Sequence, residues 1–311
     1  MIVAIIIILI CVLLFVVYGL IGRYFYDIAL NPKSDKEFVL KHIEDGEDPI
    51  EKVKRQEWLN RYSIDVYVNS SHNGNLKLHA YEVKAEKETN KWVIAIHGYM
   101  GEGKGLAYHA QEFYKRGYNV LVPDLRGHGT SEGDYIGMGW HDRLDIVDWI
   151  NHIITKRDKD AKIYIFGISM GSATTMMTLG EDLPSNVMLA ISDCGYTSTW
   201  DEFAFQLKQL FKLSTFPALY AANSYCKLKA HYDLKKSSSV EQLKKAKVPV
   251  LFIHGDSDDF VPYKMLDQVY EATNSPKEKL VIEGAGHGLA ATVNPELYWK
   301  KIDEFIDKYG A

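Results

Sequence analysis

The alternation of short apolar runs with longer amphipathic stretches constrains this chain more than any other feature. Eight runs have the character of strands, and they lie at 63–68, 76–83, 91–96, 118–123, 162–166, 188–192, 248–253 and 279–282. Helical patterns lie between or after most of the later runs, at 103–116, 140–155, 171–180, 262–272 and 295–308. The pattern predicts an α/β fold with a mostly parallel, eight-stranded sheet and helices on both faces.

One segment, at about 197–247, interrupts this rhythm. It contains no clear strand and is rich in aromatic and aliphatic side chains, among them Trp200, Phe203 and Phe211. Two interpretations stay open: a pair of helices that packs on the sheet edge, or a small helical cap that lines an apolar pocket. We favour the cap, because a long insertion in a compact domain usually has a role.

The first residues differ from all that follow. Residues 2–22 carry no formal charge, and as a helix they would reach about 31 Å, which is close to the hydrocarbon thickness of a bilayer. A cleaved signal peptide fits less well, because the run is long and no basic residue precedes it. We therefore expect a transmembrane anchor over 1–22, a neck over 23–62 and a main domain over 63–311, which should stay active without residues 1–28.

Composition excludes several classes of protein. The net charge of −5 and the pI near 6.1 give no basic excess, so we expect no nucleic-acid partner. Of three cysteines, Cys11 lies in the apolar segment, which leaves only Cys194 and Cys226 as a pair and argues against a disulfide framework. The histidines are dispersed without metal-ligand spacing, so we expect neither a metal nor another cofactor. The sequence does not indicate an oligomeric state.

The sequence Gly-Ile-Ser-Met-Gly at 167–171 is the strongest chemical signal. It follows a predicted strand and precedes a predicted helix, as a serine nucleophile on a tight turn requires. A plain turn with a helix-capping serine is the structural alternative. The context favours Ser169 as a nucleophile.

A serine hydroxyl needs a base to take its proton, and the base needs a carboxylate to orient it. His287 is the candidate base, because it lies among glycines just past the last predicted strand. Four carboxylates at strand ends are candidates for the acid: Asp193, Asp256, Asp258 and Asp259. Spacing alone does not choose among them.

A tetrahedral oxyanion needs two N–H donors. The backbone amide of Met170, next to the nucleophile, and that of Tyr99, in the loop after strand 91–96, are the candidates. His97, which precedes this loop, is interpreted as a structural residue.

Five motifs together resemble the α/β-hydrolase superfamily: His97-Gly98, the loop 123–131 (Pro-Asp-Leu-Arg-Gly-His-Gly-Thr-Ser), the serine turn, the stretch 254–262 (His-Gly-Asp-Ser-Asp-Asp-Phe-Val-Pro) and Gly286-His287. More narrowly, the chain resembles bacterial membrane-anchored or cell-surface hydrolases of the serine-aminopeptidase-like and feruloyl-esterase-like group. In that pattern the acid is the Asp four residues after the histidine, which is Asp258. The resemblance covers about residues 63–309.

The expected function is a serine hydrolase that cleaves acyl or aryl carboxylic esters, small or lipid-like, through an acyl-enzyme intermediate. A serine aminopeptidase is the alternative, but the sequence places no acidic group to hold a substrate amine. A non-catalytic scaffold is the rival from another class.

The side of the membrane stays open. Basic residues after the anchor, including Arg23, Lys33 and Lys36, would place the main domain in the cytoplasm by the positive-inside rule. The resemblance to cell-surface hydrolases favours the opposite face.

Overall fold

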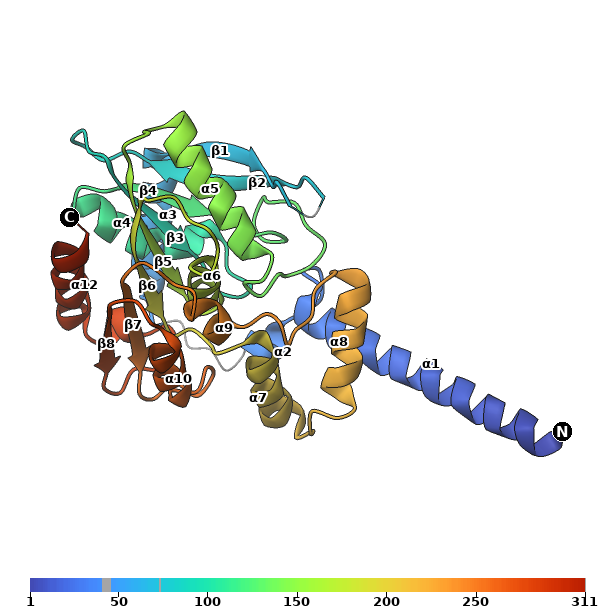
Figure 1. Cartoon of the computed structure of the whole chain (residues 1–311). Coiled ribbons are helices and arrows are strands. Elements are labelled where there is room, and N and C mark those ends of the chain that lie inside the picture. The colour runs from blue at the N-terminus through green and yellow to red at the C-terminus, as the bar shows by residue number, and fades with distance from the viewer. Residues whose placement is uncertain (41–45, 73, 311) are drawn as a thin grey trace.

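The computed structural model describes residues 1–40, 46–72 and 74–310 and contains one eight-stranded sheet (Figure 1). The strands are β1 (Ser63–Asn69), β2 (Lys77–Val83), β3 (Lys91–Ile96), β4 (Asn119–Pro123), β5 (Lys162–Ile168), β6 (Val187–Asp193), β7 (Val250–Gly255) and β8 (Lys277–Ile282). Their order is β1-β2-β4-β3-β5-β6-β7-β8. Only β2 runs opposite to the other strands of this sheet, so the predicted mostly parallel sheet is confirmed.

Helices cover both faces of the sheet because its strands are apolar on both sides. In β3, Trp92 and Ile94 enter one hydrophobic cluster, whereas Val93 and Ala95 enter the other. The first cluster is covered by α5 (Asp142–Lys156), α6 (Met170–Thr178) and α10 (Lys264–Ala272). The second is covered by α3 (Pro49–Tyr62), α4 (Ala107–Lys115) and α12 (Pro295–Tyr309). Short helical turns complete the chain: α2 (Glu37–Leu40), η1 (Gly103–Leu106) and α11 (Ala290–Val293).

The segment after β6 forms a small helical cap. It consists of α7 (Thr199–Phe211) and α8 (Ala218–Lys229), after which α9 (Ser239–Leu243) returns to pack on α6 of the main body. Ser198 begins α7 by accepting a hydrogen bond from the amide of Asp201. Figure 1 shows α7 and α8 on the side of the molecule from which the N-terminal helix projects.

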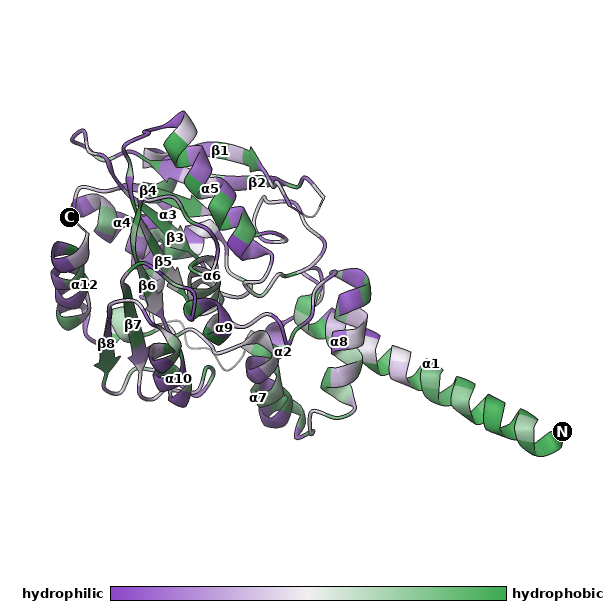
Figure 2. Ribbon diagram, viewed as in Figure 1, coloured by the Kyte–Doolittle hydropathy of each residue, from purple (hydrophilic) through white to green (hydrophobic). Residues whose placement is uncertain are grey.

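The N-terminal helix α1 (Ile2–Leu30) is long and apolar enough to cross a membrane. Its most apolar 18-residue window has a mean hydropathy of 3.4, and none of that window is buried in the protein. Figure 2 shows this projecting part as almost uniformly hydrophobic.

The helix does not end where the apolar run ends at Gly22 but continues to Leu30. Its last turns pack against the cap: Tyr18 is hydrogen-bonded to Ser224, and the ring of Tyr26 lies 5.2 Å from that of Tyr225. The close approach needs a glycine at position 22, because a Cβ there would lie 2.5 Å from the carbonyl oxygen of Ala221.

Two features fix the end of this helix, one within the neck and one on the main body. The buried ammonium of Lys36 donates hydrogen bonds to the carbonyl oxygens of Ile28 and Asn31, which satisfies groups that a helix terminus leaves unpaired. The carbonyl of Leu30 accepts from the amide of Ile136. The predicted neck is thus partly a continuation of α1; residues 41–45 of the neck lie outside the described residues.

Candidate active site

Ser169 lies on a strained turn between β5 and α6. Its φ of 56° is in the left-handed region, which is uncommon for a residue with a side chain and costs of order 1–3 kcal/mol. The glycines on either side allow the turn: a Cβ on Gly171 would lie 2.0 Å from the carbonyl oxygen of Ile96, and one on Gly167 would collide with Gly171. The sequence therefore presents the hydroxyl at the carboxyl ends of the parallel strands.

His287 and Asp258 reach this serine from the loops after β8 and β7. The Nε2 atom of His287 lies 2.8 Å from Ser169 Oγ, and its Nδ1 atom lies 2.8 Å from Asp258 Oδ2. The hydroxyl, the imidazole and the carboxylate thus form one hydrogen-bonded series. This geometry allows the imidazole to take a proton from the serine while its other nitrogen donates to the carboxylate.

The surroundings of Asp258 keep it ionised. Burial raises its pKa, but hydrogen bonds from His254 and His287 outweigh burial and hold the pKa at about 2. The amides of Phe260 and Val261 donate to its other oxygen at 3.0 and 2.8 Å. A carboxylate that accepts so many hydrogen bonds is fixed in place as well as charged.

The other three candidate acids lie elsewhere. Asp256 accepts a hydrogen bond from the amide of Gly284, and both Asp256 and Asp259 are exposed. Asp193 is buried, and its Oδ2 accepts from the hydroxyl of Tyr298 at 2.9 Å. Burial raises the pKa of Asp193 to about 6. Among these carboxylates, only Asp258 is hydrogen-bonded to His287 in the described chain.

The two amides expected to bind an oxyanion are those of Tyr99, in the loop after β3, and of Met170, the first residue of α6 after Ser169. Neither donates a hydrogen bond within residues 1–40, 46–72 and 74–310, and the loop of Tyr99 lies against the nucleophile. A Cβ on Gly98 would lie 3.4 Å from the Cβ of Ser169. The Tyr99 hydroxyl donates to the carbonyl oxygen of Ala29 at 2.7 Å, so this loop is tied to the end of α1.

Two buried groups hold the loops around the site. His97 donates from Nδ1 to the carbonyl of Gly98 and accepts at Nε2 from the amide of Leu125, which requires one neutral tautomer. Burial accordingly lowers its pKa to about 3. Asp124 accepts from the amides of Gly103 and Thr130 and pairs with His79. Both residues position backbone and do not contact the serine hydroxyl.

A pocket with an empty volume of about 860 Å³, part of it open to solvent, begins at Ser169. Apart from the serine, its polar members are Glu202 and Gln206 of the cap. The other lining side chains are apolar or aromatic. Most come from the cap, from the loops of Tyr99 and Asp258, and from the last turns of α1, where Phe25, Ile28 and Ala29 contribute. The arrangement suits a substrate with an apolar acyl or aryl group.

Glu202 is the site residue that the sequence analysis missed. Its Oε1 accepts from the side chain of Gln206 at 2.8 Å, and its buried Oε2 has no partner in the described chain. Burial, with a smaller contribution from the charge of Asp258, raises its pKa to about 8 against the opposing hydrogen bond from Gln206. The only signal was an acidic residue on the predicted cap.

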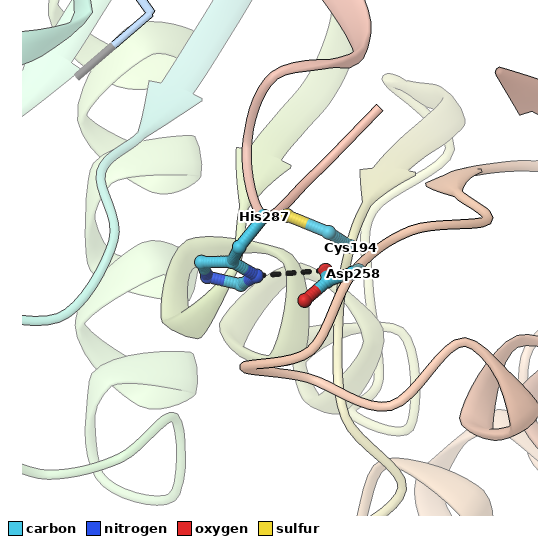
Figure 3. A group of neighbouring side chains, drawn as sticks. All are labelled: Cys194, Asp258 and His287. Atoms are coloured by element: carbon cyan, nitrogen blue, oxygen red, sulfur yellow. Dashed lines mark hydrogen bonds and ion pairs between the residues drawn. The ribbon is translucent and has the colours of Figure 1, made fainter. Parts of the chain in front are cut away.

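Cys194, Asp258 and His287 bring three potential metal-ligand atoms within 4.8 Å of one another (Figure 3). Burial raises the pKa of the Cys194 thiol well above its usual range, which disfavours the thiolate that binds metals. The imidazole of His287 already bridges Ser169 and Asp258. These residues fit a hydrogen-bonded catalytic group better than a metal centre.

Comparison with known proteins agrees with this fold. The family model described as serine aminopeptidase, S33, matches residues 87–215. YqkD of Bacillus subtilis, described as uncharacterized, is 26% identical over 90% of this chain and 89% of its own length. The α/β-hydrolase domain-containing protein WAV2 of Arabidopsis thaliana is 27% identical over 81% of this chain and 80% of its own.

Among solved structures, the esterase Pf2001 of Pyrococcus furiosus superposes with a TM-score of 0.66. It covers 82% of this chain and 96% of its own at 24% identity, and so shows the fold alone. Together the sequence relatives, the family model and the sheet define an α/β hydrolase. The fold is that of an α/β hydrolase, and the family model, the relatives and the esterase neighbour support a hydrolase of the α/β-hydrolase superfamily.

Proposed function

We propose that the protein is a serine hydrolase that cleaves carboxylic esters through an acyl-enzyme intermediate. The observation that carries the proposal is the hydrogen-bonded series Ser169–His287–Asp258, with both distances at 2.8 Å. Ser169 is the nucleophile, His287 the general base and acid, and Asp258 the residue that orients the imidazole. The amides of Tyr99 and Met170 bind the oxyanion.

The proposed reaction has two halves. Ser169 Oγ attacks the ester carbonyl while His287 Nε2 takes its proton, and the resulting imidazolium then protonates the departing alcohol. Water next enters, His287 removes its proton, and hydroxide attack on the acyl-enzyme releases the acid and returns the proton to Ser169. Asp258 stays ionised throughout because its pKa is about 2.

We further propose that residues 1–22 anchor the protein in a membrane as the first part of α1. The length and hydropathy of the helix support an anchor. The substrate is then a small-molecule or lipid-like ester that reaches the pocket beneath the cap. The pocket lining supports an acyl or aryl group next to the scissile bond.

Fluorophosphonate labelling of the full chain in detergent tests the proposal, with Ser169→Ala as control. We expect labelling of the wild type only, and a loss of p-nitrophenyl ester turnover of about 10⁴-fold or more in the variant. Equal, slow turnover by both proteins, with no labelling of either, would support the non-catalytic scaffold instead.

Glu202 favours a second candidate function, an aminopeptidase. A carboxyl group in the pocket, with one oxygen unpartnered, is the acidic group that would bind a substrate amine. An ammonium next to Glu202 would favour its ionised form and lower its pKa from about 8. In this case Glu202→Gln should raise KM for aminoacyl anilides at least tenfold and leave KM for uncharged esters unchanged. Equal effects on both substrates would count against the peptidase.

A further inference from the structure

The cap surface beside α1 has an unusual composition. Between Phe203 and Ala230 there are four lysines and no aspartate or glutamate, in a chain whose net charge is −5. Several large apolar side chains on the same segment are exposed, with Phe216 at 69% and Leu228 at 67%. Lys212 and Lys229 are exposed next to them in sequence.

A count of residues in α1 shows where this segment would lie relative to a membrane that the helix spans. The part of α1 that is free of the cap, Ile2–Val17, would span about 24 Å, whereas a hydrocarbon core is about 30 Å thick and takes about 20 residues. The span must therefore include the turn that begins at Tyr18, and this turn is the one that contacts α8 through Ser224 and Ala221. A membrane that holds α1 thus has α8 at its surface.

We propose that the exposed face of the cap, formed by Leu213, Phe216, Tyr220 and Leu228 with Lys212 and Lys229, docks on an anionic lipid bilayer. The apolar side chains enter the interface, and the lysines contact anionic headgroups. Scattered exposed apolar residues need no explanation, but these belong to one short stretch of the cap: Leu213 and Phe216 lie in the connection between α7 and α8, and Tyr220 and Leu228 lie on α8, the helix that packs against α1.

A docked cap would let the pocket take its substrate from the lipid bilayer. This part of the inference rests on the proposed esterase function. The pocket wall includes Phe25 and Ile28 of α1 and Leu210 and Phe211 of α7. Phe211 is followed directly by Lys212 and Leu213 of the docking face. An ester dissolved in the bilayer can pass from the lipid to Ser169 along apolar side chains without crossing water. The substrate class is therefore an ester that resides in the lipid phase.

The docking itself is tested without any enzyme assay. The full chain carrying Cys11→Ser is reconstituted in phosphatidylcholine–phosphatidylglycerol vesicles, and a fluorophore is attached at Leu228→Cys or, as matched control, at Leu297→Cys. Cys194 and Cys226 are buried, so they should not compete for the label. Leu297 is 41% exposed on α12, far from α1 in Figure 1.

Nitroxide-labelled lipid should quench the fluorophore at position 228 at least threefold more than that at position 297. Equal quenching at the two positions would overturn the docking, whatever the enzyme does.

Substrate entry is tested by the double variant Phe216→Glu, Leu228→Glu, with Leu297→Glu as control. We expect hydrolysis of 4-methylumbelliferyl oleate in the vesicles to fall at least tenfold, while turnover of water-soluble p-nitrophenyl acetate stays within twofold. The double variant Lys212→Glu, Lys229→Glu should reduce only the increase in oleate hydrolysis that phosphatidylglycerol causes relative to vesicles of phosphatidylcholine alone. Unchanged hydrolysis of the oleate in both double variants would overturn the inference. Absence of turnover of either ester by the wild type would instead refute the proposed function.

Discussion

At the scale of single residues, the assignment of the acid depends on one hydrogen bond. Asp258→Asn keeps the shape of the side chain but removes the charge that stabilises an imidazolium at His287. We expect kcat/KM for a p-nitrophenyl ester to fall by about 10³–10⁴-fold. Asp256→Asn and Asp259→Asn serve as controls and should stay within about threefold, because both side chains are exposed and neither is hydrogen-bonded to His287. A larger loss of kcat/KM in either control, or in Asp193→Asn, than in Asp258→Asn would assign the role of the acid to that residue instead.

Glu202 should make stability depend on pH. Its carboxyl titrates at about 8 in the folded protein and near 4.3 when unfolded, so the unfolded chain loses this proton first. Between these two pKa values the folded state holds one more proton than the unfolded state. The contribution of Glu202 to the free energy of unfolding therefore falls by up to about 1.4 kcal/mol for each unit by which the pH rises. The neutral amide of Glu202→Gln does not titrate.

Thermal melts at pH 5, 6, 7 and 8 measure this effect. The melting temperature of Glu202→Gln relative to wild type should rise steadily across the series, because the wild type alone loses stability. A constant difference would mean that Glu202 is already ionised in the folded protein.

The two kinds of site residue differ in what the sequence reveals. Ser169 and His287 follow predicted strands and lie among glycines, so local sequence was sufficient to select them. Asp258 needed the resemblance to a family, since four acids at strand ends fit the spacing equally well. Glu202 could not be found in this way, because its significance comes from tertiary burial and from the unpartnered oxygen.

At the scale of elements, strands were easier to predict than the end of the first helix. Parallel strands buried on both faces are short continuous apolar runs, and each of the eight predicted runs overlaps a strand. In α1, the apolar run ends before Arg23, but the helix continues through charged residues to Leu30. Side chains such as Tyr26 are buried there by the cap, and sequence periodicity does not show which distant segment provides that contact.

At the scale of the whole molecule, α1 is part of the folded body as well as a projecting apolar helix. Its last turns line the pocket, and its carbonyl groups accept hydrogen bonds from the Tyr99 hydroxyl and from the Ile136 amide. The loop of Tyr99, the cap and the first helix therefore meet at one place. The prediction that the chain without residues 1–28 stays active is untested, but these contacts argue against it.

Two truncations separate the membrane span from the pocket wall. A chain without Ile2–Val17 keeps the turns that contact α8 and should retain turnover of a soluble ester in detergent within about threefold. A chain without residues 2–28 loses Phe25, Tyr26 and Ile28, of which the first two pack on cap aromatic rings. Burial of one large apolar side chain is worth about 1.5–3 kcal/mol, so its melting temperature should fall by about 5 °C or more.

The longer truncation should also lose at least tenfold in kcat/KM, because the pocket opens to water on one side and Tyr99 loses part of the segment that fixes its loop. The shorter truncation controls for removal of the apolar span. Equal activity and equal melting temperatures in the two truncated proteins would show that α1 is a tether only, and that the cap and the Tyr99 loop hold the site without it.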